Sequence, residues 1–480
     1  MRFRLLLFLL LLPLIWINVG ATHDWGDDFA QYLIQAKNLT TGQPQTENGL
    51  VFPSGELPYA LQAYPIGFPL LLAPIFTFFQ LQIQPYLILN GILLIMLCIL
   101  SFEYSKKYFD TRKALLIALL IGYNLFSLLL KEEILSEFAF TVALMGVFLL
   151  LKKDGRDAGK NDFVKAALLT GFLISIRFAG VVIIPAVIGC LLMWKWQNKR
   201  ERLMNGLIFS LIAVGLFLFL NVLLFDIGLT HFIEFYGRQF AANNLKVDNT
   251  FSHLLSQLPA IFFPFAQAKV VSYFILGVIL IGLIGRLDKV EISDGFFLLY
   301  ILLLITYPYS DASFRFLFPV VPLLIIYFFS GAQKILEFIS SKKSAFVFLT
   351  IITGTSILFS LKYNFDQPIA DGPYSKDARA AFAFIRKNVP PNEVVLFSRA
   401  RAMVVYGNHP STFLTQHKTP EENFELLLQS KCRTILFADE RSGAYNESLA
   451  EFITAKKSSY DTLFHDDRYT LLTIHVSVQE

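Results

Sequence analysis

Long apolar runs alternate with short polar segments over the first three quarters of the chain. A helix needs about 20 predominantly apolar residues to cross the roughly 30 Å hydrocarbon core of a bilayer. Eleven runs approach that length, near residues 4–20, 84–103, 114–130, 135–151, 164–178, 179–194, 205–225, 270–285, 295–309, 316–331 and 345–361. The pattern predicts a mainly α-helical polytopic membrane protein with about eleven spans.

A long polar stretch interrupts this pattern between the first two spans. Directly after Asp27 and Asp28, apolar residues recur near the helical period and predict a short amphipathic helix. The later segment 67–80 is apolar but short, and it contains Pro69 and Pro74. It therefore predicts a helix that lies at the membrane interface or re-enters the membrane without crossing it.

The chain after residue 361 has a different pattern. Segments typical of helices and of buried strands alternate, with a helix from Asp377, a strand from Glu393, a Thr-capped helix after Thr419, a strand from Arg433 and a last strand near 469–476. This alternation predicts a small α/β domain of roughly 110 residues. We therefore divide the chain into a transmembrane domain, 1–361, and an α/β domain, 362–480.

Composition agrees with a membrane protein. The chain is 55% hydrophobic and 16% charged, whereas a soluble domain carries about 25% charged residues. The three cysteines are widely scattered and form neither a disulfide framework nor a metal-ligand spacing. The glycines from Gly277 to Gly282 belong to an apolar helix and do not form a phosphate loop. No nucleic-acid partner is expected.

Basic residues predict the orientation of the spans. Up to Leu361, twenty Lys and Arg fall in the loops on one side of the predicted spans and seven on the other. Cytoplasmic loops carry the excess of positive charge. The N-terminus is therefore expected in the cytoplasm, behind a retained signal-anchor helix, and the first loop and the α/β domain are expected outside.

Few ionisable residues are expected at the outer face, where such groups are costly and are often functional. The acids are Asp24, Asp27, Asp28, Glu132, Glu133, Glu137 and Asp311, and the bases are Lys131, Arg177, Arg238, Lys269 and Arg315. Two acidic clusters that are distant in sequence could thus converge on one site.

Asp27, Asp28 and Glu137 are the candidate acids for chemistry. A carboxylate beside a hydroxyl or amine nucleophile can take its proton during attack. Neighbours on a helix point in different directions, so Asp27 could be the base while Asp28 positions an acceptor or a metal. Both could instead be solvated charges favoured by the helix dipole. Glu137 lies one turn into an apolar run, where an unpaired carboxylate would cost several kcal/mol.

Arg315 and Arg177 are the candidate positively charged residues for binding a phosphate. A guanidinium at a membrane boundary can bind phosphate bidentately and neutralise a leaving group. Arg315 could equally be an interfacial anchor or a partner of Asp311. Two carboxylate motifs suit Mg²⁺ or Mn²⁺, but they also suit a site without metal, and both alternatives remain open.

Four segments together resemble membrane glycosyltransferases of the C type, in particular the bacterial relatives of protein O-mannosyltransferases and aminoarabinose transferases. They are G-D-D-F-A-Q-Y-L-I-Q-A-K-N-L, Y-P-I-G-F-P-L-L-L-A-P, L-S-E-F-A-F and F-R-F-L-F-P-V-V-P. The second is commonly His-Pro-Pro-Gly or Tyr-Pro-Pro-Gly in the family, and here Ile66 replaces the second proline. The resemblance covers residues 1–361 in order and in sidedness.

The resemblance implies inverting transfer of a hexose or pentose from a polyprenyl-phosphate-linked donor to a cell-envelope acceptor, which is a glycan, lipid or protein. The reaction would take place at the outer face of the bacterial cytoplasmic membrane. Asp27 matches the family's catalytic aspartate, the general base, and Asp28 falls where the family usually has Glu. Glu137 matches an acid that contacts the acceptor or a metal, and Arg315 would neutralise the departing lipid phosphate. The α/β domain would help to choose the acceptor.

Two other function classes are weighed against this one. A transporter or lipid flippase is expected to show internal repeats and charges buried in the middle of spans, and neither is visible. An O-antigen ligase or polymerase usually carries its large outer loop late in the chain, whereas the long loop here is the first.

Overall fold

The computed structural model describes residues 2–52, 62–151, 160–193, 199–228, 247–266, 268–306, 314–368, 370–415 and 418–474, with Ile233 and Gly237 between them. Two candidates from the sequence, Arg238 and Asp311, lie outside the described residues.

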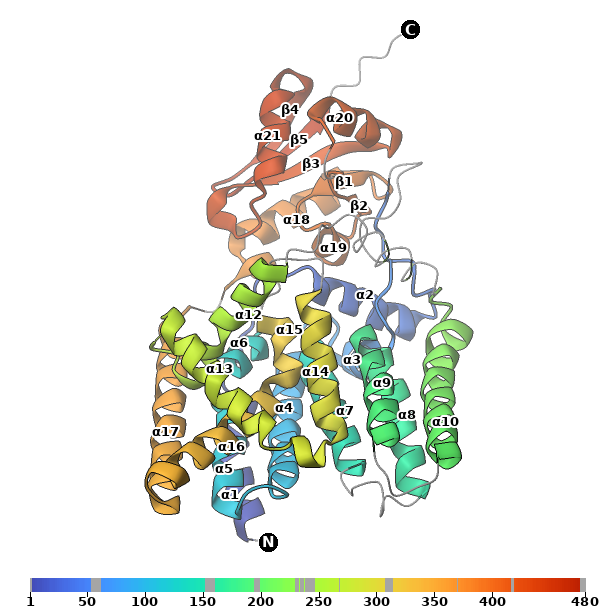
Figure 1. Cartoon of the computed structure of the whole chain (residues 1–480). Coiled ribbons are helices and arrows are strands. Elements are labelled where there is room, and N and C mark those ends of the chain that lie inside the picture. The colour runs from blue at the N-terminus through green and yellow to red at the C-terminus, as the bar shows by residue number, and fades with distance from the viewer. Residues whose placement is uncertain are drawn as a thin grey trace.

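A bundle of apolar helices carries a small α/β domain at one end, and the N-terminus lies at the opposite end (Figure 1). The bundle helices are α1 (Arg2–Leu11), α4 (Gln84–Ser105), α5 (Thr111–Tyr123), α6 (Leu125–Lys131), α7 (Glu137–Leu150), α8 (Lys160–Ile176), α9 (Ile183–Met193), α10 (Lys199–Leu218), α12 (Val247–Phe262), α13 (Lys269–Ile284), α14 (Ile292–Ile305), α15 (Phe314–Leu317), α16 (Val321–Ile339) and α17 (Lys342–Asp366).

The helices confirm an integral membrane protein. Among the described residues, four helices are long and apolar enough to cross a bilayer, namely Gln84–Ser105, Arg200–Leu224, Phe314–Ile339 and Lys342–Asp366. A fifth crossing results if α5 and α6, bent by 44° at their junction, form one span. Five further apolar helices have 10–17 residues. The count of eleven spans stays a prediction.

Helix breaks affect several predicted spans, among them 114–130 at the bend between α5 and α6. The first predicted span, 4–20, has α1 only to Leu11 and continues as a short 3-10 helix, Leu12–Ile15, because Pro13 has no N–H to continue the α-helical ladder. The run 164–194 breaks at Arg177, whose extended backbone separates α8 from the 3-10 helix Phe178–Val182 that leads into α9. The sequence predicted this break at Arg177.

Loops that the sequence assigns to the cytoplasmic side lie together at one end of the bundle. Arg4 near the N-terminus pairs with Glu103 at 2.7 Å, and Lys107 pairs with Glu291 at 2.8 Å. These contacts join the ends of α1, α4 and α14 on the side away from the α/β domain (Figure 1).

Helix α3 (Gly67–Phe79) has both ends on the side of the α/β domain. A Cβ added at Gly67 would lie 2.7 Å from the carbonyl oxygen of Ser175, close to the break at Arg177. Beyond the other end of α3, the carbonyl of Leu81 accepts a hydrogen bond of 2.8 Å from Tyr374 of the C-terminal region. A helix that starts and finishes at one end of the bundle does not cross it.

Close contact between α13 and α16 depends on two glycines. A Cβ on Gly282 would lie 1.9 Å from the carbonyl oxygen of Tyr327, and a Cβ on Gly331 would lie 1.9 Å from that of Val278. Small residues let helix backbones approach closely in membranes.

A five-stranded mixed sheet forms the centre of the α/β domain, with strand order β2-β1-β3-β5-β4. Its strands are β1 (Val394–Phe397), β2 (Ser411–Thr412), β3 (Cys432–Ala438), β4 (Tyr460–His465) and β5 (Tyr469–Ile474), and its longer helices are α18 (Lys376–Asn388), α20 (Pro420–Gln429) and α21 (Glu447–Ala455). The predicted elements α18, β1, α20, β3 and β5 are confirmed, and Thr419 caps α20 as expected.

The first loop packs into this domain although the two are distant in sequence. The indole of Trp25 is fully buried and donates a 2.8 Å hydrogen bond to the carbonyl of Ser442. The backbone around Leu50 pairs with Ser411 of β2 in parallel. The boundary at residue 362 stays a prediction, because parts of the first loop pack against the C-terminal domain.

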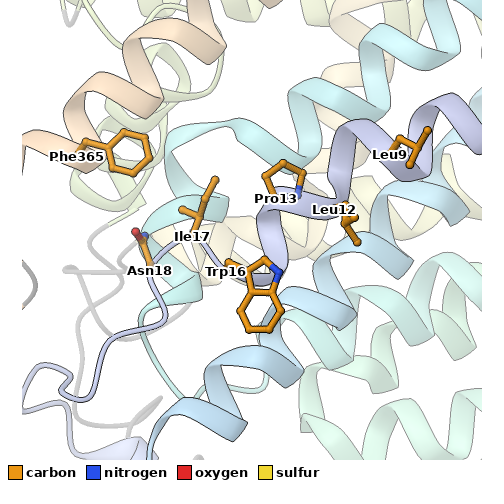
Figure 2. Close-up of a pocket in the computed structure, with 7 residues that line it drawn as sticks. All are labelled: Leu9, Leu12, Pro13, Trp16, Ile17, Asn18 and Phe365. Carbon is orange, nitrogen blue, oxygen red and sulfur yellow. The ribbon is translucent and has the colours of Figure 1, made fainter.

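An open apolar groove lies on the outside of the bundle between the first helices and the end of α17 (Figure 2). Its lining residues are Leu9, Leu12, Pro13, Trp16, Ile17, Asn18 and Phe365. Trp16 is 68% exposed, which is the exposure expected of an indole that faces lipid at a membrane interface.

Candidate active site

Helix α2 (Asp28–Thr41) brings two of the predicted acids to the boundary between the bundle and the α/β domain (Figure 1). Its apolar side chains pack against α3. Gln35 of α2 exchanges two hydrogen bonds of 2.9 Å with the backbone of Tyr64. The helix therefore fixes Asp27, Asp28 and Tyr64 relative to one another.

Asp28 is the first of two carboxylates that share Arg315. The hydroxyl of Tyr64 donates to Asp28 Oδ1 at 2.6 Å, and Arg315 Nη2 donates to Asp28 Oδ2 at 2.8 Å. Arg315 Nε donates to Glu137 Oε1 at 3.1 Å, and Arg177 Nη1 lies 2.6 Å from the same oxygen. Side chains from the first loop, α7, α15 and the α8–α9 break thus meet in one cluster.

Asp27 has a partner that comes from the α/β domain. Arg401, in the short helix α19 (Ala400–Ala402) that follows β1, donates from Nη1 to Asp27 Oδ2 at 3.0 Å and to the hydroxyl of Tyr64 at 3.1 Å. Arg401 is 5% exposed. The second oxygen, Asp27 Oδ1, is buried and accepts no hydrogen bond from the part of the chain that the structure describes.

The cluster is electrically balanced. Three carboxylates, on Asp27, Asp28 and Glu137, face three guanidinium groups. Pairing offsets the cost of burying these charges. A lipid phosphate that entered the site would add negative charge and compete with the carboxylates for the same N–H donors.

The neighbouring aspartates have opposite pKa shifts. Burial raises the pKa of Asp27, with the nearby charge of Asp28 adding to this effect and Arg401 opposing it. Burial also acts to raise the pKa of Asp28, but Arg315 and the Tyr64 hydroxyl outweigh it and lower the pKa to about 2. Carboxylates whose environments push their pKa values apart are suited to different roles.

A second acidic group lies beside the cluster, between α6 and α7. Burial raises the pKa of Glu132 and of Glu133 to about 7, and the charge of Asp24 adds to both shifts. A Cβ added at Gly26 would lie 3.8 Å from Glu133 Oε2, so this acid lies next to the segment that carries Asp27.

A divalent cation does not fit the cluster in this arrangement. Within the described ranges, no three His, Cys, Asp or Glu side chains are grouped so that they could hold a metal ion. Asp27, Asp28 and Glu137 each face an arginine, which repels a cation. We derive no chemical step through Mg²⁺ or Mn²⁺.

The structure brings all five predicted site residues into this one cluster, namely Asp27, Asp28, Glu137, Arg177 and Arg315. The alternative in which both aspartates are solvated helix charges gains no support, because Asp28 is ion-paired and Asp27 Oδ1 is buried. The catalytic roles of the five residues stay predictions.

Sequence reasoning missed Tyr64 and Arg401. Tyr64 begins the segment Y-P-I-G, so its position in a candidate motif was available. Arg401 follows a predicted buried strand, and residues at the carboxyl ends of parallel strands often line sites. Nothing local in the sequence linked it to Asp27, which lies 374 residues earlier.

Comparisons with known proteins identify solved structures that have a similar fold. No protein-family profile and no curated protein matches the chain. ArnT from Cupriavidus metallidurans, solved bound to undecaprenyl phosphate, aligns with a TM-score of 0.61 and 12% identity over 99% of this chain and 98% of its own. The archaeal oligosaccharyltransferase AglB from Archaeoglobus fulgidus, in complex with an inhibitory peptide and a dolichol-phosphate, aligns with a TM-score of 0.59 and 11% identity over 91% of this chain and 69% of its own.

An oligosaccharyltransferase from Archaeoglobus fulgidus has also been solved with Zn and sulfate, and it aligns with a TM-score of 0.59 and 12% identity over 89% of this chain and 68% of its own. At such identities the likeness shows a shared fold. The chain therefore shares its fold with ArnT and with the archaeal oligosaccharyltransferase.

Proposed function

We propose that the protein is an inverting glycosyltransferase that moves a sugar from a polyprenyl-phosphate-linked donor to a cell-envelope acceptor. The observation that carries the proposal is the cluster itself, in which a buried aspartate oxygen without a partner among the described residues lies beside paired arginines at one end of a membrane bundle. Support comes from the fold shared with ArnT, which is bound to undecaprenyl phosphate.

Asp27 acts as the general base in this proposal. Its Oδ1 takes the proton from an acceptor hydroxyl or amine as that group attacks the anomeric carbon. The bond from this carbon to the phosphate oxygen breaks, and the lipid phosphate leaves with the electron pair. A single displacement from the opposite face inverts the anomeric configuration.

Arg315 and Arg177 stabilise the departing phosphate. Preorganised donors aimed at developing charge are usually the largest contribution to such catalysis, and a phosphate leaving group needs no proton. On donor binding, the phosphate takes N–H donors of Arg315 that now face Asp28 and Glu137. These carboxylates then lie close to the oxocarbenium-like charge on the sugar.

The proposed orientation has the N-terminus in the cytoplasm, with the cluster and the α/β domain outside. The excess of Lys and Arg in the opposite loops supports it. The acceptor would reach Asp27 from the side of the α/β domain, because Arg401 of that domain borders the aspartate. This domain would therefore help to choose among glycan, lipid and protein acceptors.

Mass spectrometry of surface glycans and lipid-linked sugars tests the proposal in cells. Cells without the protein are expected to lose one sugar from a glycan and to accumulate the corresponding polyprenyl-phosphate sugar. D27N should reproduce both changes at wild-type expression, whereas E47Q, an exposed acid of the same loop, should behave as wild type. A glycan profile unchanged by deletion would contradict the proposal, and so would full transfer by D27N.

The transporter alternative gains no support from the structure. Ion pairs of the described bundle residues gather at its two ends, as Arg4–Glu103 and Lys107–Glu291 do at one and Arg315–Asp28 does at the other. A flippase would move a lipid-linked sugar without cleaving it, so the same mass spectra distinguish the two functions.

A further inference from the structure

We infer that Arg401 is a positioning residue for Asp27 and that the C-terminal domain thereby forms part of the catalytic centre. Arg401 holds one carboxylate oxygen so that the other faces the acceptor. The inference rests on the proposed function and adds a residue from outside the membrane bundle to it.

The orientation of Asp27 provides the first argument. Asp27 occupies the position before α2, but its backbone is helical there (φ −106°, ψ −29°) and lacks the extended conformation in which a capping aspartate accepts from the first turn. Its side chain makes no such cap bond. Instead Oδ2 accepts from Arg401 Nη1 at 3.0 Å. The contact that orients the carboxylate therefore comes from the C-terminal domain and not from a capping bond within α2.

Arg401 is itself held in place. It is almost fully buried, it donates to the Tyr64 hydroxyl at 3.1 Å, and its guanidinium carbon lies 5.2 Å from the centre of the Tyr64 ring. Tyr64 in turn donates to Asp28. One guanidinium thus sets the position of Asp27 and connects it through Tyr64 to the carboxylate that Arg315 holds.

The backbone before Asp27 is anchored in the same domain. Trp25, two residues earlier, packs among Phe382, Phe397 and Tyr469 and bonds to the carbonyl of Ser442. A Cβ at Gly443 would lie 3.3 Å from the indole of Trp25. Movement of the C-terminal domain would therefore displace both Arg401 and the segment that carries the proposed base.

Further along the loop, a second attachment confines the same segment. The amide of Val51 donates to the carbonyl of Ser411 at 2.9 Å, and the amide of Ser411 donates to the carbonyl of Gly49 at 3.0 Å. The loop is thus fixed to the domain before and after α2. These contacts fix the backbone of Asp27. The orientation of its carboxylate is then set by Arg401.

Loss of Arg401 has two expected consequences. The carboxylate loses the contact that orients it, and a misplacement of about 1 Å at a reacting group can cost about 100-fold in rate. A nearby positive charge also favours the ionised form of Asp27, so its removal moves the acid limb of the pH–rate profile to higher pH. Donor binding should be little affected, because the arginines proposed to hold the phosphate are untouched.

The test compares wild type, R401Q, R401K and D27N in proteoliposomes. The probe is the mixture of polyprenyl-phosphate sugars extracted from cells that lack the protein, supplied with their envelope fraction as acceptor. Release of undecaprenyl phosphate is followed by mass spectrometry from pH 3 to 9, and binding of undecaprenyl phosphate alone is measured separately. R468Q is the control, since Arg468 belongs to a partly exposed pair with Asp377 in the same domain.

For R401Q we expect a 10- to 100-fold lower kcat, an acid limb at higher pH, and unchanged binding of undecaprenyl phosphate. R401K keeps the positive charge, so its acid limb should lie close to the wild-type pH and its kcat should be partly restored. If R401Q does not fold, the comparison of R401K with wild type tests the inference. R468Q should match wild type.

Wild-type kcat and pH profile in both Arg401 variants, with D27N inactive, would overturn the inference and leave the proposed function standing. Loss of stability and of undecaprenyl phosphate binding without any shift of the acid limb would also overturn it, because that pattern marks a purely structural residue. Full activity of D27N would instead remove the proposed function itself.

Discussion

Asp27 and Asp28 are adjacent in the chain, but their surroundings give them different chemistry. Asp28 lies between Arg315 and Tyr64, which keep it ionised. Asp27 has one oxygen on Arg401 and one oxygen buried without a hydrogen bond from the described residues. A base needs a lone pair that is not already hydrogen-bonded and a pKa high enough to hold a proton, and of these two aspartates Asp27 fits that role better.

The pH dependence of transfer follows from this difference. The base must be deprotonated, so activity falls as the pH drops through the pKa of Asp27, which burial raises above its ordinary value near 3.9. Asp28, with a pKa of about 2, stays ionised over the whole range. We expect kcat/KM, measured with the extracted donor mixture, to show an acid limb at a pH above the ordinary pKa of an aspartate. An acid limb at or below the ordinary pKa of an aspartate, or no acid limb, would contradict the assignment of the base.

Binding of the lipid phosphate should depend on Arg315. Hydrogen bonds to charged groups contribute about 1.5–3 kcal/mol each, so R315Q should weaken binding of undecaprenyl phosphate by about 10- to 100-fold. R315K keeps the charge but loses the fork geometry, and an intermediate loss is expected. Equal binding by wild type and R315Q, measured on purified protein in detergent with R468Q as control, would show that the phosphate binds elsewhere.

At the level of elements, local signals determined what the sequence could predict. Helix α20 was predictable because its Thr419 cap and early acids lie within one turn, and β1 and β3 were predictable because their apolar runs are nearly continuous. Strand β4 has mostly exposed side chains and β2 has only two residues. Neither therefore shows the alternation of apolar and polar residues from which a strand is predicted. Helix α12 lies in a predicted outer loop and is stabilised by packing against α13.

The glycines of α13 test the packing of the bundle. Gly282 lies against the backbone of α16, whereas a Cβ on Gly277, earlier on the same helix, would meet nothing within 4 Å among the described residues. Overpacking a close contact typically costs about 1–3 kcal/mol. G282L should lower the thermal unfolding temperature in detergent clearly, and G277L should change it little. Equal effects of the two substitutions would contradict the close crossing of α13 and α16.

At the scale of the whole molecule, the site is a junction between distant segments. Glu137 and Arg177 come from the bundle, Arg315 from its late helix, Asp27 from the first loop and Arg401 from the C-terminal domain. Motif resemblance found Asp27, Glu137 and Arg315, because their neighbours in sequence carry the pattern, and Arg177 was found because it interrupts an apolar run. The resemblance missed Arg401, because the contact between Arg401 and Asp27 depends on how the C-terminal domain packs against the first loop. Such packing between distant segments produces no pattern in the sequence around Arg401.

The most direct test of the central claim is single-turnover cleavage of the donor by purified protein in proteoliposomes. Wild type and E47Q, supplied with extracted polyprenyl-phosphate sugars and envelope acceptor, are expected to release undecaprenyl phosphate with transfer of the sugar and inversion at its anomeric carbon. D27N is expected to bind undecaprenyl phosphate normally and to release none from the donor. Release by D27N at the wild-type rate, or retention of the anomeric configuration, would contradict the account.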